Sequence, residues 1–332
     1  MRLRLLVEPQ QGASYDDVLR FAVQAERLGF DGIFTSDHYL GVGAVPSPLP
    51  PCDAWTTVAG LARDTTRIKL GTLVTPVTFR RLGPLAIVAS QVDTMSGGRV
   101  TLGLGAGWHE PEHEAYGLPF PDTAIRFQQL EEQLQIVRGI WETPAGKTFT
   151  FTGRHASLKD VPGYGASPPG HRPSILIGGS GPQKTPRLAA AYADEYNVPV
   201  RSLDVTRDQF ERAERACRLL GRDPGSLVLS AAQVLCAGET AAELARRAGR
   251  LGRTVDDLIA AGVAGSVDQV IEKIGAFAGI GASRLYLQCL DLADVEQLHV
   301  VAERIMPLVG HHHARDTPAA SDSGKPEEKH PL

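Results

Sequence analysis

RIKLGTLVTPVTFRRLGPLAIVASQVDTMSGGRVTLGLG, residues 67–105, contains one complete strand–helix–strand unit. Arg67–Val74 and Arg99–Gly105 are short runs rich in branched apolar residues, as buried strands are. Between them, Pro84–Met95 is predicted to be a helix that ends at Ser96-Gly97-Gly98. Two strands joined by such a helix lie parallel, because parallel strands need a long crossover connection.

The same unit recurs along most of the chain. The predicted helices alternate with strands, and the clearest of them are Ser14–Leu28, Trp55–Arg63, Asp122–Trp141, Thr206–Leu220, Ser266–Ala278 and Val295–Val309. The predicted strands are Arg2–Val7, Gly32–Ser36, Arg67–Val74, Arg99–Gly105, Ser174–Gly179, Glu195–Val200, Leu227–Cys236 and Ser283–Cys289. Eight units in 332 residues favour an α/β protein with a (β/α)₈ TIM barrel over an open doubly wound sheet, the other architecture with this rhythm.

One long stretch interrupts the repeat. Glu142–Arg172 is rich in Gly and Pro, with a hairpin-like piece at Phe149–Leu158. This insertion after the fourth strand/helix unit is interpreted as a lid or wall beside the functional face. Residues 1–310 are then expected to form one barrel domain. Residues 311–332 are polar and rich in Pro, Ser, Glu and Lys, which predicts a disordered C-terminal tail.

The composition argues against several classes of function. A formal net charge of −4 gives no general attraction to nucleic acid or to an anionic membrane. No run approaches the roughly 18 apolar residues of a membrane span, and the apolar run before Glu8 is too short for a secretory signal. Because the four cysteines are dispersed and form no CxxC pair, they are expected to be reduced, as in a cytoplasmic protein.

Distinctive residues gather where four neighbouring strands end. Chemistry in a TIM barrel is found at the carboxyl ends of the strands. These ends carry glycines, polar groups and an aromatic residue, in the segments Ser36–Tyr39, Leu73–Pro76, Gly105–His109 and Gly178–Gly181. We therefore expect them to converge on a single site that takes a small-molecule substrate.

Two glycine-rich turns are candidates for binding a cofactor. Gly178-Gly179-Ser180-Gly181 precedes a helix, where free backbone N–H groups suit a phosphate, although a tight strand-to-helix turn has the same pattern. Gly103–Gly107 lacks the third glycine of a dinucleotide fingerprint. It is interpreted either as a close approach of the backbone to a flat ring or as a simple turn.

Three side chains near these turns are candidates for chemistry. Asp37 and His38 end the second strand, and an imidazole exchanges protons near neutral pH, although a histidine there also serves to cap a loop. Trp108 is suited to wall a pocket for a planar or apolar ligand, or to fill core.

The segment His109–His113 matches the HExxH zinc pattern, which requires both histidines on one face of a continuous helix. Pro111 is tolerated only in a helix's first turn, so His109 is expected to precede the helix. We therefore predict no metal site here.

Taken together, these segments resemble the luciferase-like family of flavin- and deazaflavin-dependent oxidoreductases, especially its actinobacterial branch that uses the deazaflavin coenzyme F420. The matching stretches follow the family order across the first 200 residues, and the C-terminal third matches more loosely. They are VEPQQG (7–12), AERLGFDGIFTSDHYL (25–40), DAWTTVAGLARDTTRIKLGTLVTPVTFR (53–80), MSGGRVTLGLGAGWHEPEHEAYGLPFP (95–121), RFQQLEEQLQIVRGIW (126–141) and ILIGGSGPQKTPRLAAAYADEYN (175–197).

The resemblance implies a role for each candidate in binding the cofactor. It places Asp37 against the ring and Leu73-Val74 as the family's non-prolyl cis peptide on one ring face. Gly105 and Gly107 would let the backbone approach the ring. The cofactor phosphate would be held by Gly178, Gly179, Ser180 and Gly181.

The resemblance places His38 near the reactive carbon of the ring, and Trp108 and His109 are grouped with it as candidate catalytic residues. Trp108 stands where the sugar-phosphate dehydrogenase branch has an acidic glutamate. This departure puts a sugar-phosphate substrate in doubt and leaves His38 or His109 as the proton donor.

The activity implied is hydride transfer between F420 and an unidentified small organic substrate, by a homodimer. The alternative is a monooxygenase of the same family that depends on reduced FMN.

Overall fold

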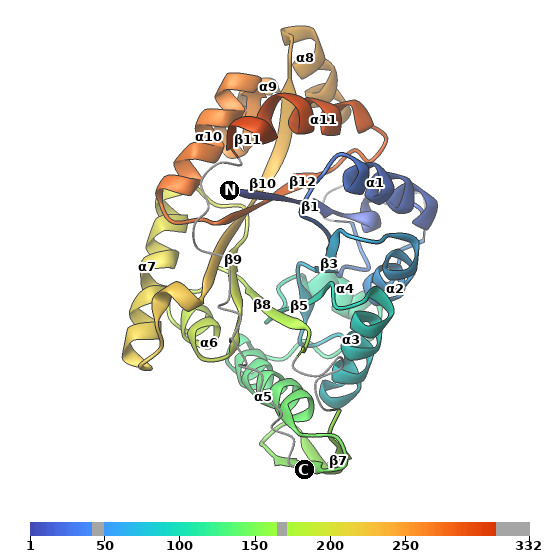
Figure 1. Cartoon of the computed structure of the whole chain (residues 1–332), viewed down its shortest axis with the longest axis vertical. Coiled ribbons are helices and arrows are strands. Elements are labelled where there is room, and N and C mark those ends of the chain that lie inside the picture. Colours follow the sequence, from blue (N-terminus) through green and yellow to red (C-terminus); the bar gives the residue numbers. More distant parts are fainter. Residues whose placement is uncertain (42–49, 165–170, 310–332) are drawn as a thin grey trace, which may run out of the picture.

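The computed structural model describes residues 1–41, 50–164 and 171–309, so the predicted tail lies outside the described residues. Eight parallel strands form a closed ring, visible near the centre of Figure 1. In order around the ring they are β1 (Arg2–Val7), β2 (Gly32–Thr35), β3 (Lys69–Thr72), β5 (Val100–Gly105), β8 (Ser174–Gly178), β9 (Glu195–Val198), β10 (Val228–Gly238) and β12 (Arg284–Cys289). Because β12 pairs with β1 and β9 with β10, the barrel closes and the predicted fold is confirmed.

The helices form an outer layer around the barrel (Figure 1). They are α1 (Tyr15–Arg27), α2 (Ala54–Asp64), α3 (Leu82–Ser96), α4 (Glu110–Ala115), α5 (Thr123–Glu142), α6 (Lys184–Tyr192), α7 (Leu203–Leu219), α8 (Ala241–Arg250), α9 (Val255–Ala261), α10 (Val267–Gly279), α11 (Val295–Val300) and α12 (Met306–Val309). Local signals set their ends: Ser14 caps α1 in a capping box with Asp17, and left-handed Gly97 ends α3. Among the described residues, no helix is both long and apolar enough to cross a membrane.

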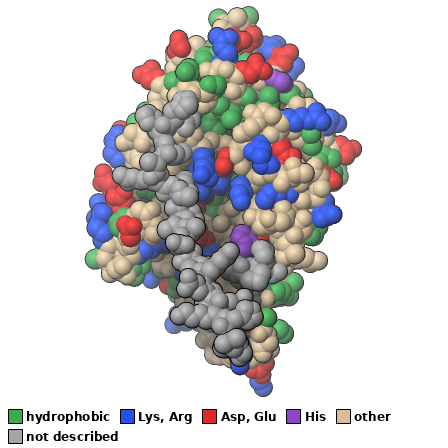
Figure 2. All heavy atoms as spheres, viewed as in Figure 1, with side chains coloured by type: hydrophobic (Ala, Val, Ile, Leu, Met, Phe, Trp, Pro, Cys, Tyr) green, Lys and Arg blue, Asp and Glu red, His purple; other side chains and the backbone are tan. Residues whose placement is uncertain are grey.

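The interior of the barrel is filled in layers. Phe34, Leu176 and Tyr286 form an apolar layer beneath Leu73 and Val74. Below them, Arg4 Nη1 lies 3.3 Å from Glu195 Oε2, and the Tyr286 hydroxyl donates to Glu195 Oε1 at 2.9 Å. These buried charges join β1, β9 and β12. On the face viewed in Figure 2, basic and acidic side chains are interspersed over the barrel.

Two short strands were not predicted as separate elements. β11 (Val263–Ser266) pairs with the end of β10 outside the closed ring, and β4 (Thr75–Pro76) pairs with β5. Both are too short to give a periodic pattern in the sequence. Helix α4, which Pro111 indicated, follows β5.

The insertion contains the expected hairpin, formed by β6 (Thr148–Thr152) and β7 (Ser157–Pro162). Its tip is fixed to α5, because the Glu132 carboxylate accepts the backbone N–H groups of Arg154, His155 and Ala156. In Figure 1 the hairpin lies outside the barrel, beside α5. The interpretation as a lid is wrong. Helix α5 returns the chain to the amino ends of the strands before the insertion begins, and no described residue of 142–172 lines the cavity at the other end.

Candidate active site

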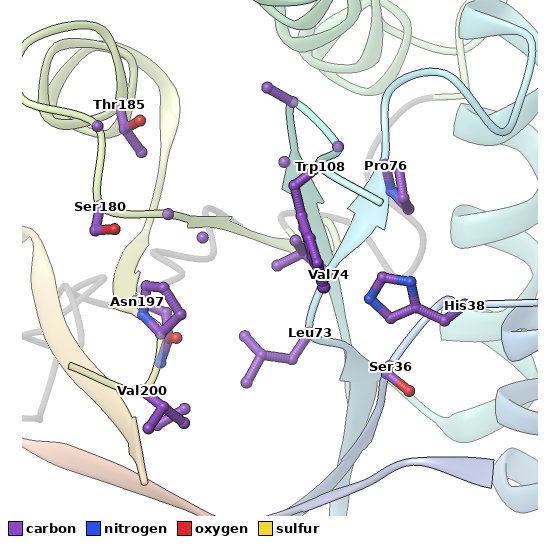
Figure 3. Close-up of a pocket in the computed structure, with 18 of the residues that line it drawn as sticks. Ser36, His38, Leu73, Val74, Pro76, Trp108, Ser180, Thr185, Asn197 and Val200 are labelled. Carbon is purple, nitrogen blue, oxygen red and sulfur yellow. The ribbon is translucent and has the colours of Figure 1, made fainter. Parts of the chain in front are cut away.

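A cavity of about 560 Å³ opens at the carboxyl ends of the barrel strands. Figure 3 shows His38 and Trp108 facing Ser180, Thr185 and Asn197 across it, with Leu73 between the two sides. The predicted site residues that line this cavity are His38, Leu73, Val74, Gly105, Gly107, Trp108, Gly178, Gly179, Ser180 and Gly181. The strand ends therefore converge on one site, as expected. Asp37 and His109 are not among the lining residues.

Asp37 points away from the cavity, whereas its neighbours Ser36 and His38 line it. Its buried carboxylate accepts from the Thr75 hydroxyl at 2.7 Å and from Arg80 Nη2 at 3.0 Å. Burial raises the pKa of Asp37 despite the opposing charge of Arg80. The structure thus gives Asp37 no direct path to a ligand in the cavity.

His38 is held by Glu112, a residue that the sequence analysis did not select. His38 Nδ1 lies 2.9 Å from Oε1 and 3.1 Å from Oε2 of Glu112, whose side chain is fully buried. The same carboxylate accepts the Tyr39 backbone N–H at 3.0 Å. No described residue forms a hydrogen bond with the other ring nitrogen, Nε2, and Figure 3 shows the His38 ring extending toward the cavity.

The electrostatics of this pair favour the charged forms of both groups. Burial lowers the pKa of His38, but the hydrogen bond and negative charge of Glu112 raise it by more, so the net pKa is raised. Burial likewise raises the pKa of Glu112, and His38 outweighs this effect and lowers it. An ionised carboxylate only accepts hydrogen bonds, so Nδ1 of His38 carries a proton and donates a hydrogen bond to Glu112.

The floor of the cavity is the peptide between Leu73 and Val74, which is cis, as the family resemblance implied. The glycines around it make room for the Val74 side chain. A Cβ at Gly105 would lie 2.7 Å from Val74 Cγ2, and one at Gly178 would lie 2.8 Å from Val74 Cγ1. The space at Gly105 and Gly178 is therefore taken by Val74, so these glycines serve packing of the floor as well as any approach to a ligand.

The turn after β8 leaves backbone donors free. Within the described residues, the N–H groups of Ser180 and Gly181 donate to no acceptor, whereas Gly179 N–H donates to Asn197 O at 3.0 Å. A Cβ at Gly181 would lie 2.8 Å from Thr185 Oγ1. Free N–H groups beside hydroxyls just before a helix suit an anion. The basic residues at the start of α6 are engaged elsewhere: Arg187 pairs with Glu131 and Lys184 lies over the Phe127 ring.

Trp108 and His109 form the rim. The Trp108 side chain lines the cavity yet is 62% exposed, and its ring lies edge-on to His38 at 5.6 Å between centroids. The His109 ring lies 6.0 Å from that of His38. An exposed indole at the mouth offers a flat apolar surface that a ligand would cover.

The HExxH segment folds as Pro111 requires. Helix α4 begins at Glu110 and His109 is its N-cap, which confirms that His109 precedes the helix. Both nitrogens of His113 are engaged, with His109 O at 2.8 Å and the Thr78 hydroxyl at 2.6 Å. His113 is thus a structural histidine.

A closed (β/α)₈ barrel with its cavity at the carboxyl ends of the strands is the arrangement of TIM-barrel enzymes. The family model for luciferase-like monooxygenases matches residues 2–259, and the chain belongs to this family.

The chain is similar to a dehydrogenase and to a monooxygenase. An F420-dependent glucose-6-phosphate dehydrogenase of Microbacterium testaceum is 37% identical over 187 residues, 54% of this chain and 52% of the relative. The chain thus spans about half the length of that relative. A pyrimidine monooxygenase, RutA, of a Bradyrhizobium species is 30% identical over 276 residues, 79% of this chain and 72% of the relative.

Solved structures share the fold. An F420-dependent secondary alcohol dehydrogenase in complex with an F420-acetone adduct has a TM-score of 0.80 at 20% identity, covering 93% of this chain and 98% of that one. A coenzyme F420-dependent tetrahydromethanopterin reductase from Methanopyrus kandleri has a TM-score of 0.73 at 16% identity, covering 92% and 98%.

Proposed function

We propose that this protein is an F420-dependent oxidoreductase that transfers a hydride between the deazaflavin and a small organic substrate. The observation that carries the proposal is the meeting of three features in one cavity: the proton-carrying His38, the apolar Leu73-Val74 floor and the open Ser180 turn. F420, when bound, supplies the hydride or accepts it. The dehydrogenase relatives support this choice of cofactor.

The residues present fit such a group. The Ser180 and Gly181 N–H groups and the Ser180 and Thr185 hydroxyls are suited to hold a phosphate, with Gly178 and Gly179 leaving the turn free of side chains. Leu73 and Val74 present an apolar surface for a flat ring.

His38 is proposed to move the proton that accompanies the hydride. In the direction of reduction, the substrate gains a hydride and the Nε2 proton of His38, and in oxidation Nε2 takes that proton back. Trp108 is proposed to shape the substrate side of the cavity, with the His109 ring 5.0 Å from its own ring, between centroids. Asp37 contributes indirectly, by its bonds to Thr75 and Arg80 beneath the loop that carries His38.

Titration of the purified protein with F420 and with FMN, each oxidised and reduced, tests the proposal. F420 is expected to bind, and Gly181→Val, which blocks the Ser180 turn, should weaken binding. Gly275→Val in α10 is the control, because Gly275 lies outside the cavity lining and a Cβ there would meet no atom within 4 Å. Binding of neither cofactor would overturn the proposal.

The alternative function is a monooxygenase that depends on reduced FMN. It is favoured by the RutA relative, which aligns with a larger share of this chain than the dehydrogenase does. Consumption of oxygen during turnover with reduced FMN would support this alternative, since a flavin supplies oxygen chemistry that a deazaflavin does not readily supply.

We also propose that the protein is a cytoplasmic homodimer with a single barrel domain. The four cysteines are free thiols, which suits a reducing compartment. Light scattering should give twice the 35.6 kDa of one chain. A mass of one chain at micromolar concentration would contradict the dimer.

A further inference from the structure

Glu112 connects two segments that are far apart in the sequence. It lies in α4, and its carboxylate receives hydrogen bonds from His38 Nδ1 and from the Tyr39 backbone N–H, both in the segment that follows β2. The Glu112 side chain has no exposed surface, so solvent does not compete for these bonds. A buried carboxylate with this set of partners fixes the ring that it contacts.

The orientation of the His38 ring determines which of its two nitrogens faces the cavity. With Nδ1 bound to Glu112, the remaining nitrogen, Nε2, is the one free to meet a ligand. Apart from Glu112, the charged or titratable groups that act on His38 are Glu8 after β1, Asp37 in its own segment, and His109, whose ring lies 6.0 Å away. The carboxylates among them all favour a cationic ring.

We propose that Glu112 is a positioning residue, which orients His38 so that Nε2 is presented to the cavity as an N–H donor and keeps the ring in its protonated form. This inference rests on the proposed function only in that the Nε2 proton is given to the substrate. The orientation and the charge are properties of the protein alone. The raised pKa of His38 agrees with the geometry.

The test is a pH titration of ¹⁵N-histidine-labelled protein without cofactor, followed by two-dimensional NMR of the ring nitrogens. His38 is assigned by its loss in His38→Gln. In the unmodified protein, the His38 pKa should exceed about 6.5, and the neutral form should keep its proton on Nδ1. The variant Glu112→Gln should lower this pKa by about one pH unit or more. Glu112→Asp, which keeps the charge, should restore part of it.

Glu114→Gln is the matched control, because it removes an exposed carboxylate from the same helix and should leave His38 unchanged. In the unmodified protein, a His38 pKa below about 6.5, or a neutral His38 ring protonated on Nε2, would overturn the proposal. This readout does not depend on whether Glu112→Gln folds. An equal shift in Glu114→Gln and Glu112→Gln would overturn it too. Failure of F420 to bind leaves these readouts unaffected, so the two proposals fail separately.

Discussion

His38 is the residue whose replacement should separate binding from turnover. Its ring lines the cavity but lies on the opposite side from the Ser180 turn (Figure 3). His38→Gln should therefore bind F420 within about threefold of the unmodified protein and lose about 10²–10⁴-fold in turnover, the usual contribution of a general acid–base group. Fluorescence titration of F420 and single-turnover kinetics measure the two effects.

Replacement of an exposed histidine, as in His299→Gln, is the control and should change neither quantity. Full turnover by His38→Gln would remove His38 from the catalytic group.

The same residue should also make stability depend on pH. Because the folded pKa of His38 is raised, its contribution to stability is complete below the unfolded value of about 6.5 and is lost as the pH rises through the folded pKa. The unfolding free energy of the unmodified protein should thus exceed that of His38→Gln by more at pH 6 than at pH 9. Urea denaturation of both proteins at the two pH values measures the difference. A constant difference would show that the ring does not titrate as inferred.

At the scale of single residues, the sequence predicted which residues lie near the site better than it predicted where their side chains point. His38 and Trp108 were selected because their types are unusual at strand ends, and both line the cavity. Asp37 was selected for the same reason, but its carboxylate is turned away from the cavity by its hydrogen bonds with Thr75 and Arg80. Glu112 was passed over because its partner is 74 positions away and no local pattern marks such a pair.

Among the elements, the packing of the β3–β4 segment on β5 depends on glycine. Gly105→Ala would place a Cβ 2.7 Å from Val74 Cγ2 and should destabilise the protein by about 1–3 kcal/mol, the usual cost of overpacking. Combination with Val74→Ala should cost less than the sum of the two single changes. Chemical denaturation of the four proteins completes the cycle. Gly275→Ala in α10, where a Cβ meets no atom within 4 Å, should not be destabilising.

The β6–β7 hairpin should be separable from the site. Glu132→Gln weakens the acceptor for three backbone N–H groups at the hairpin tip, so amide exchange in residues 148–162 should rise about tenfold or more. The affinity for F420 should not change, because the hairpin does not line the cavity. Hydrogen exchange read by mass spectrometry and a cofactor titration test both parts.

Glu131→Gln provides the comparison, since Glu131 pairs with Arg187 on α6 and not with the hairpin. Weaker cofactor binding in Glu132→Gln alone would bring back the interpretation as a lid.

Periodicity gave the long elements and missed the short ones. Helix α5 was predicted at Asp122–Trp141 and is found at Thr123–Glu142, because its apolar stripe is long enough to read. The insertion was recognised but assigned to the wrong end of the barrel. Its position after a helix, and not after a strand, was the signal that places it at the amino ends.

For the molecule as a whole, the ring closure is reinforced by the buried charges at its base. Glu195 receives hydrogen bonds from Arg4, Arg284 and Tyr286, and so joins β9 to β1 and β12. Glu195→Gln should destabilise the protein by about 3–5 kcal/mol, since it removes the counter-charge of the largely buried Arg284 and leaves Arg4 paired with Asp31. Thermal and urea unfolding measure this loss.

Asp204→Asn, which changes an exposed ion pair, should cost less than about 1 kcal/mol. If Glu195→Gln and Asp204→Asn lowered the unfolding free energy equally, the buried charges at the base of the barrel would stabilise the fold no more than an exposed ion pair does.

The closed barrel was predictable because eight strand–helix units in one chain leave few other arrangements. The charged base was not predictable, since Arg4 lies 191 positions from Glu195 and 282 positions from Tyr286, and the three residues meet only when the ring closes.

Trp108 at the rim of the cavity is also suited to report ligand binding by its fluorescence. Of its three tryptophans, Trp55 and Trp141 are each 3% exposed, whereas Trp108 is 62% exposed. Emission on the long-wavelength side of the indole band therefore comes mainly from Trp108, which lines the cavity. Compounds can be screened against the unlabelled protein by the colour and intensity of that emission, before any product has been identified.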